Sequence, residues 1–521
     1  MTPEDFEKHK KVDEMVTGKK HYDLWSKVPG LLQNRISLIG FIITIVFFSL
    51  EAFLFAVEFV ISSNLYLGLI TYVILPPFLF LGLGLIIIGA IIRHRRKKRG
   101  IKSEQWEPLK IDFSIPSHRS TTLVAFVAGM ILFLASLIGV YKGYHYTETN
   151  KFCGTLCHNV MHPEYTAYQQ SSHARVHCVE CHIGNGADWY VRSKLSGAKQ
   201  FYSVLFNHFP RPIPTPVANL RPAQETCEQC HWPEKFFGAL ETQHDYFITD
   251  EDSKWDKWKL RMLVKVGGGG MQLEGIHAHM NVAADIYYAT EDTKRENITW
   301  VKTVSKNGEE KIFTTKDSPY KEKEPPKYLL RKMDCMDCHN RPSHKFEAPY
   351  RSLNRSMAYG EISSDIPEIK LKAMAALEQK YDNKETALAS IKQQLWDYYR
   401  EDHTDYYNAN KPALTKSINQ VAKIYSDNFF PFMKISWKNY PDNIGHLITP
   451  GCFRCHDGQH KTTLGETITR DCNACHTIIE QGPPDSLMKS TEGLEFQHPV
   501  DIDGEWEDTN CSECHTGGEV E

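Results

Sequence analysis

The sequence predicts a protein made mainly of α-helix and coil, with three transmembrane helices ahead of a large polar part that contains a small β-insertion. Three observations lead to this fold class. Long apolar stretches lie near the N-terminus, fourteen cysteines follow them in closely spaced pairs, and one region between the third and fourth pairs alternates apolar and polar residues. The averaged composition, 41% hydrophobic with a formal net charge of −4, hides this division.

The membrane anchor is expected within residues 36–141. Residues 36–92 are almost wholly apolar apart from a polar break at 62–64, and residues 121–141 form a further apolar stretch. They provide three segments of the ~20 residues that cross a bilayer as a helix. Lysine and arginine are frequent in residues 1–35 and in the loop 93–120, which opens with RHRRKKR. Because basic loops favour the cytoplasmic side, we expect both in the cytoplasm and everything after residue 141 outside it.

The fourteen cysteines form seven motifs, each ending in histidine. They are CGTLCH at 153–158, CVECH at 178–182, CEQCH at 227–231, CMDCH at 335–339, CFRCH at 452–456, CNACH at 472–476 and CSECH at 511–515. Six are Cys-x-x-Cys-His, in which two thioethers hold a haem c and the histidine binds its iron, while the first has three residues between its cysteines. Neither disulfides nor zinc sites require that histidine, so both explanations are unattractive.

We therefore expect seven covalently bound haem c groups. The attaching side chains are Cys153, Cys157, Cys178, Cys181, Cys227, Cys230, Cys335, Cys338, Cys452, Cys455, Cys472, Cys475, Cys511 and Cys514. The iron ligands next to them are His158, His182, His231, His339, His456, His476 and His515. Because haem attachment takes place outside the cytoplasm, this agrees with the topology expected from charge, a multi-pass protein of the inner membrane with its haem part in the periplasm.

The spacing of the motifs divides the outer part of the chain. We expect a three-haem domain at 142–245, a β-rich insertion at 246–330 and a four-haem domain at 331–521. The insertion is predicted from the alternation in 261–315 and from the hairpin dipeptide Asn307-Gly308. Helical periodicity predicts two spacer helices, at 366–381 and 384–399. Elsewhere we expect coil and short helices around porphyrins, which supply much of the buried apolar surface.

The region from about 121 to 240 resembles the NapC/NirT family of membrane-anchored, quinol-oxidising multihaem cytochromes. The resemblance is carried by a membrane helix followed by NKFCGTLCHNVMHPEYTAYQQSSHARVHCVECH and NLRPAQETCEQCHWPEKF. The later strings GIHAHM, CMDCHNRPSHKF and GCFRCHDGQH are similar to those of larger seven-haem inner-membrane cytochromes of metal-respiring bacteria. The resemblance implies a quinol:cytochrome c oxidoreductase that oxidises membrane menaquinol and reduces periplasmic c-type cytochromes in anaerobic or extracellular respiration.

The resemblance also suggests residues for a quinol site. In such proteins a methionine near the first motif can bind the first iron, so Met161 competes with His158, unless it merely packs on the porphyrin. Lys194 matches a family lysine, although it could be a surface residue or a propionate partner, and Asp188 could replace an acidic companion that is missing here. Glu51 and Glu58 lie seven residues apart in the first span, where ionisable groups often mark proton or ligand paths, and we assign the candidate role to Glu51.

Histidines outside the motifs should supply second axial ligands, because electron-transfer haems usually carry two. The candidates that the family resemblance favours are His173, His208, His277, His344, His446, His460 and His498. The alternatives are His279, His244, His177, His162, His145 and His403.

Two other functions remain open at this stage. The protein could be a terminal reductase of a small substrate such as nitrite at an open haem, or a membrane-tethered relay reduced by a partner protein. A phosphate-binding loop and a basic patch on the outer part are both missing from the sequence, so we expect no nucleotide or nucleic acid as partner. The oligomeric state is left open.

Overall fold

The computed structural model divides the chain into two compact units. The first comprises Met1–Lys142 with Asn185–Val191, and the second comprises Gly143–Gly184 with Arg192–Glu521. The structure describes residues 34–60, 75–98, 145–184, 186–217, 221–249, 256–267, 275–279, 284–321 and 323–517, together with isolated positions between 113 and 130.

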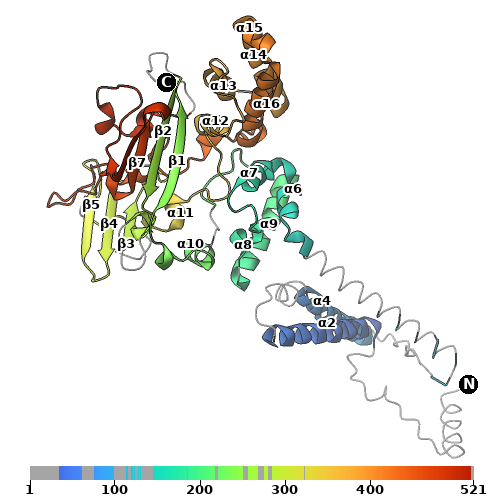
Figure 1. The fold of residues 1–521 in the computed structure, drawn as a ribbon. Coiled ribbons are helices and arrows are strands. Elements are labelled where there is room, and N and C mark those ends of the chain that lie inside the picture. Colours follow the sequence, from blue (N-terminus) through green and yellow to red (C-terminus); the bar gives the residue numbers. More distant parts are fainter. Residues whose placement is uncertain are drawn as a thin grey trace, which may run out of the picture. The chain divides into compact units, whose positions relative to one another are not determined.

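The first unit contains two long apolar helices, α2 (Arg35–Val60) and α4 (Leu75–Lys98), which pack against each other (Figure 1). They approach closely through small residues. A Cβ atom added to Gly40 would lie 2.6 Å from the carbonyl oxygen of Gly82, and the Ser37 hydroxyl donates to the Ile86 carbonyl at 3.2 Å. Small residues at the interface let helix backbones approach, as is common in membrane helix pairs.

Large apolar side chains lie on the outside of this helix pair. Phe48, Phe53 and Phe80 are all exposed. A helix pair in a water-soluble protein would instead carry polar residues on its outer face. Among the described helices one segment, Pro77–Arg96, is long and apolar enough to cross a membrane. The expected third span at 121–141 lies outside the described residues apart from isolated positions.

The second unit begins with helices that carry the first three motifs. These are α6 (Asn150–Thr155), α7 (His158–Gln170), α8 (Cys178–His182), α9 (Ala187–Leu205), whose first turns belong to the other unit, α10 (Ala223–Thr226), η4 (Cys227–Gln229) and η5 (Pro233–Lys235). Asn150 ties the first two motifs together. Its amide nitrogen donates to the Tyr168 hydroxyl at 2.6 Å, and its side-chain oxygen accepts from the Cys178 backbone N–H at 2.9 Å.

Two four-stranded antiparallel sheets follow. The first has the strand order β1-β2-β7-β8 and the second β5-β4-β3-β6. The strands are β1 (Leu240–Phe247), β2 (Lys257–Val264), β3 (Ala284–Ala289), β4 (Trp300–Ser305), β5 (Glu310–Thr314), β6 (Leu330–Lys332), β7 (His476–Gly482) and β8 (Met488–Leu494). The predicted hairpin is confirmed, because β4 pairs with β5 around a turn in which Gly308 has a φ of +87°.

Strands also form outside the predicted insertion, in a region where coil and short helices were expected. β7 and β8 come from the region of the sixth motif, and β7 pairs with β2, with Val264 opposite His476 (Figure 1). The paired residues lie more than two hundred positions apart in the sequence, so no local pattern predicts that β7 pairs with β2.

A helical region lies between the fourth and fifth motifs. It comprises α12 (Pro349–Ala358), α13 (Ile369–Glu378), α14 (Lys384–Glu401), α15 (Thr404–Ala409) and α16 (Lys411–Asn428). The two predicted spacer helices are confirmed as α13 and α14. Leu353, Leu377, Ile391 and Leu395 are fully buried in one cluster, so this region has an apolar core made of side chains alone.

Short helical turns carry the other four motifs: α11 (Cys335–Cys338), η9 (Gly451–Arg454), η10 (Cys472–Ala474) and α17 (Cys511–Cys514). Further short turns are η6 (Ile276–His279), η7 (Pro431–Met433), η8 (Trp437–Asn439), η11 (Pro484–Ser486) and η12 (Glu505–Glu507).

Candidate multihaem centre

Six motif histidines each lie opposite a second histidine. The ring centres are separated by 6.1 Å in His231–His173, 6.1 Å in His182–His344, 6.3 Å in His339–His277, 5.8 Å in His456–His279, 6.2 Å in His476–His446 and 5.9 Å in His515–His498. Two imidazoles on opposite sides of one metal have ring centres roughly 6 Å apart, because each metal–nitrogen bond is about 2 Å long and the ring centre lies about 1 Å behind the nitrogen. The spacing therefore fits one iron between the members of each pair.

The second nitrogen of these rings is also fixed. Nδ1 of five histidines opposite the motifs lies near a backbone carbonyl: His277 with Val266 at 2.7 Å, His279 with Ile276 at 2.8 Å, His498 with Val500 at 2.8 Å, His344 with Glu164 at 3.0 Å and His173 with Pro342 at 3.3 Å. A hydrogen bond from Nδ1–H leaves Nε2 as the nitrogen with a free lone pair. Metal-binding histidines are commonly oriented in this way.

Burial keeps several of these imidazoles neutral. It lowers the pKa of His344, His456 and His476. Burial, together with the nearby His476, lowers the pKa of His446 to about 4. The neutral form is the one that binds a metal ion.

His460 is placed differently from the expectation. Its ring is completely buried, with Nδ1 2.9 Å from an Asp457 carboxylate oxygen and Nε2 3.0 Å from the Ile298 carbonyl. Both nitrogens are therefore engaged, and His279 lies opposite His456 instead. The family resemblance suggested His460, but the turn held by Asp457 directs its ring toward the segment before β4.

The first motif has no described histidine pair. The side chain of His158 lies outside the described residues, and His208 is exposed, with its ring near those of Tyr202 and Phe206. Among the alternatives, Nε2 of His403 lies 3.0 Å from the Tyr398 hydroxyl, and the ring centre of His162 lies 5.4 Å from that of Phe430.

A large, mainly apolar cavity joins the last five motifs. Its volume is about 2270 Å³, and residues of the third to seventh motifs line it together with the histidines opposite them. All fourteen cysteines are free, as thioether attachment requires. The paired imidazoles, the free thiols and the apolar cavity fit haem c.

Consecutive motifs adjoin in the order of the sequence. The Cys153 thiol forms a hydrogen bond with Cys178, and the Cys227 thiol does so with Cys335, so the first motif meets the second and the third meets the fourth. Cys181 and Cys230, of the second and third motifs, are close enough for their charges to interact. These contacts connect the first four motifs in series.

The later motifs are joined by side chains. Arg454 of the fifth motif donates to the Asp337 carbonyl of the fourth at 2.7 Å. Phe453 stacks on His446, the histidine opposite the sixth motif, with 4.3 Å between ring centres. Arg470, just before the sixth motif, donates to the Thr509 carbonyl ahead of the seventh at 3.1 Å.

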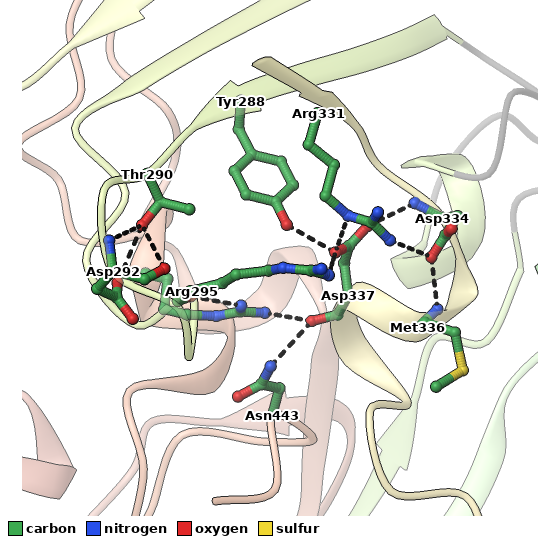
Figure 2. A network of polar contacts seen from close by, with 10 residues as sticks. Tyr288, Thr290, Asp292, Arg295, Arg331, Asp334, Met336, Asp337 and Asn443 are labelled. Atoms are coloured by element: carbon green, nitrogen blue, oxygen red, sulfur yellow. Dashed lines mark hydrogen bonds and ion pairs between the residues drawn. The ribbon is translucent and has the colours of Figure 1, made fainter. Parts of the chain in front are cut away.

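Asp337, between the two cysteines of the fourth motif, is the centre of a buried polar network (Figure 2). One carboxylate oxygen accepts hydrogen bonds from Tyr288 at 2.6 Å, Arg331 at 2.7 Å and Arg295 at 2.9 Å. The other accepts from the Asp334 backbone N–H at 2.7 Å and so caps α11. The network ties this motif to the second sheet. Sequence reasoning missed it, although a charged residue inside a haem motif was an available signal.

The quinol-site candidates occupy separate places. A hydrogen bond with Cys178 and the positive charge of Lys194 hold the pKa of the Cys153 thiol at about 7, so Lys194 lies near the first motif. Met161 is half-buried on α7, and its backbone N–H donates to the Cys157 carbonyl at 2.9 Å. Asp188 is exposed in the first turn of α9, and Glu51 is half-buried on α2. The side chain of Glu58 is outside the described residues.

Comparison with known proteins agrees with a multihaem cytochrome c. A family model described as NapC/NirT cytochrome c family, N-terminal region, matches residues 115–212. The chain is 40% identical over 491 residues to the cytochrome c-type protein ImcH of Geobacter sulfurreducens, covering 94% of this chain and 96% of ImcH. It is 31% identical over 114 residues to NrfH of Wolinella succinogenes (21% of this chain, 63% of NrfH) and 30% identical over 99 residues to TorC of Escherichia coli K12 (18% and 25%). No solved structure matches.

The motifs, the histidine pairs and the apolar helices thus define a membrane-anchored multihaem cytochrome of electron transfer, with covalently bound haem c. The chain belongs to the NapC/NirT cytochrome c family and, within it, to the ImcH type.

Proposed function

We propose that this protein is an inner-membrane menaquinol dehydrogenase that delivers electrons through seven haem c groups to periplasmic c-type cytochromes, in anaerobic or extracellular respiration. The observation that carries the proposal is the set of six motif histidines that each face a second histidine. Irons with two such ligands have no open position for a small substrate, which favours electron transfer over a terminal reductase.

The residues of the chain would hold each haem in a defined place. The cysteine pairs form the thioethers, the histidine pairs bind the irons, and the carbonyls on Nδ1 keep the rings in position. We replace His460 with His279 as the second ligand at the fifth motif, and assign His173, His344, His277, His446 and His498 to the third, second, fourth, sixth and seventh motifs. The haems supply one-electron redox chemistry, and the adjoining motifs favour a route in sequence order, from the first motif to the seventh.

The anchor is proposed to have three membrane helices: α2, α4 and the apolar stretch 121–141. The packing of α2 on α4 through Ser37 and Gly40, with large apolar side chains outside, supports membrane burial of this pair. The basic end of α4 supports a cytoplasmic loop at 93–120 and, after a third span, a haem-bearing unit in the periplasm.

Quinol oxidation is assigned to the region of the first motif. Each menaquinol gives up two electrons and two protons as it becomes menaquinone. Lys194 lies near Cys153 of the first motif, which supports a role for this lysine in binding quinol or accepting a proton. Met161 or His158 would complete the first iron, and Asp188 and Glu51 are proposed for proton release.

The test is rapid mixing of the purified, detergent-held protein with a reduced menaquinol analogue, followed through the haem absorbance bands with and without a quinone-site inhibitor. We expect fast, inhibitor-sensitive reduction, slowed at least tenfold in Lys194→Met, with haem content and dithionite reduction unchanged. Lys199→Met, an exposed lysine on the same helix, is the matched control. Haems that quinol leaves oxidised but dithionite reduces would refute the proposal and point to a protein donor or a reductase substrate.

A further inference from the structure

Lys370, near the start of α13, is a buried lysine. It is 6% exposed, its ammonium donates a hydrogen bond to the Phe247 carbonyl, and it lies 4.5 Å from the centre of the Tyr350 ring. Among the described residues no carboxylate lies close enough to influence it, and burial alone lowers its pKa to about 7. An ammonium removed from water without a counter-charge is strongly disfavoured, so an anion is expected beside it.

A second buried donor lies next to it. Asn354 on α12 is also almost completely buried, and its side-chain oxygen accepts from the Phe247 backbone N–H at 3.1 Å. That hydrogen bond fixes the orientation of the amide and leaves its NH₂ group without an acceptor in the described part of the chain. Lys370 and Asn354 thus flank Phe247 with two donors that need an acceptor, and a carboxylate provides two oxygens.

Both donors line the large cavity, together with Tyr350 and with Cys511 and His515 of the seventh motif. The ring of Tyr350 connects them to that motif, since its centre is 6.5 Å from the centre of the His515 ring. Other cations that line the cavity have partners of their own. Arg355 pairs with Glu347 at 2.6 Å, Lys345 and Arg351 pair with Asp442, and Arg470 donates to the carbonyls of Asp508 and Thr509.

We propose that Lys370 and Asn354 bind a propionate carboxylate of the haem attached at Cys511 and Cys514. This inference rests on haem attachment at the seventh motif, which is part of the proposed function, and not on quinol oxidation. Lys370 is a positioning residue that holds the haem by one edge. Because a nearby positive charge favours the reduced iron over the more positive oxidised iron, it also raises the reduction potential of that haem.

The experiment is a spectroelectrochemical redox titration of the purified full-length protein, with haem content measured separately by mass. In Lys370→Met we expect seven attached haems, with one of the seven midpoint potentials shifted downward. Lys370→Arg, which keeps the charge, should restore that potential. The matched control is Lys380→Met, an exposed lysine in the loop after the same helix, which should leave all potentials unchanged. Unchanged potentials in a fully loaded Lys370→Met protein would overturn the proposal.

A second variant covers the case in which Lys370→Met loses haem. Asn354→Asp keeps the acceptor for the Phe247 backbone N–H and adds a carboxylate that competes for Lys370, so the same single midpoint potential should fall. An unchanged potential in a fully loaded Asn354→Asp protein would count against the proposal.

A soluble anion is the other source of a carboxylate. If acetate, titrated at constant ionic strength, shifted one potential in a saturable manner in the wild type but not in Lys370→Met, the site would serve a soluble carboxylate and the haem assignment would fall.

Discussion

Replacing Asp337 with asparagine tests whether the buried network of the fourth motif holds the haem-bearing unit together. The side chain is 1% exposed, and one of its oxygens is shared by Tyr288, Arg295 and Arg331 (Figure 2). Asparagine keeps the shape but removes the charge. Its NH₂ group would also face the Asp334 backbone N–H, donor against donor, where the carboxylate accepts at 2.7 Å.

The size of the effect follows from these contacts. Removing one partner of a buried ion pair costs ~3–5 kcal/mol, and hydrogen bonds to charged groups contribute about 1.5–3 kcal/mol each. The side chains of Arg295 and Arg331 are 23% and 31% exposed, so water can solvate them partly once the charge is gone. We therefore expect a loss of about 3 kcal/mol, the lower end of the range.

The assay is thermal unfolding followed by circular dichroism in the haem absorption region. With an unfolding entropy of about 2.1 cal/mol/K per residue over the roughly 370 residues of the second unit, about 3 kcal/mol corresponds to a melting temperature lower by about 4 °C. Glu513→Gln is the control, because Glu513 occupies the same position of the seventh motif but is exposed, and it should stay within about 1 °C of the wild type. Equal melting temperatures for the two variants would refute the reasoning.

Three further outcomes are expected. His279→Ala should convert one haem from low spin to high spin in electron paramagnetic resonance spectra, whereas His460→Ala should leave the low-spin count unchanged and lower the melting temperature; the opposite pattern would restore His460 as the ligand. Gly184→Ala should reduce the yield of fully haem-loaded protein, measured by mass, because its Cβ would lie 1.9 Å from a guanidinium nitrogen of Arg221 and Gly184 has a φ of +63°; an unchanged yield would mean that Arg221 moves aside freely. Gly40→Leu should separate α2 from α4 and lower the amount of protein recovered from membranes, measured by haem absorbance, whereas wild-type recovery would show that this interface is dispensable.

The attachment sites could be predicted from the sequence because each motif is local. The pairing of histidines could not, since it is decided in three dimensions. His173 lies five residues before the second motif but opposite the histidine of the third, and His344 lies five residues after the fourth motif but opposite that of the second. The outer part of the chain has thirteen histidines outside the motifs for seven irons. Five of the favoured ones lie opposite motif histidines, whereas the ring of His460 is held by Asp457 and the Ile298 carbonyl.

The same division holds for the fold. The β4–β5 hairpin and the helices α13 and α14 have local signals: the Asn307-Gly308 turn and apolar residues at helical spacing. β7 has only a short β-branched run, at 477–479, as a local signal, and its partner strand β2 lies more than two hundred residues earlier in the chain. The Asp337 network is equally non-local, since Tyr288 lies on β3 and Arg331 on β6.

Distance along the chain is therefore a poor guide to the distance between haem sites. The fourth and fifth motifs are separated by the whole helical region from α12 to α16, whose apolar core also includes Phe247 of β1. Three contacts bring the two motifs back together. Arg454 and Asn443 both donate to the Asp337 carbonyl, at 2.7 and 3.1 Å, and the single turn η6 provides His277 to one motif and His279 to the other. The helical region therefore separates the fourth and fifth motifs in sequence but not in space.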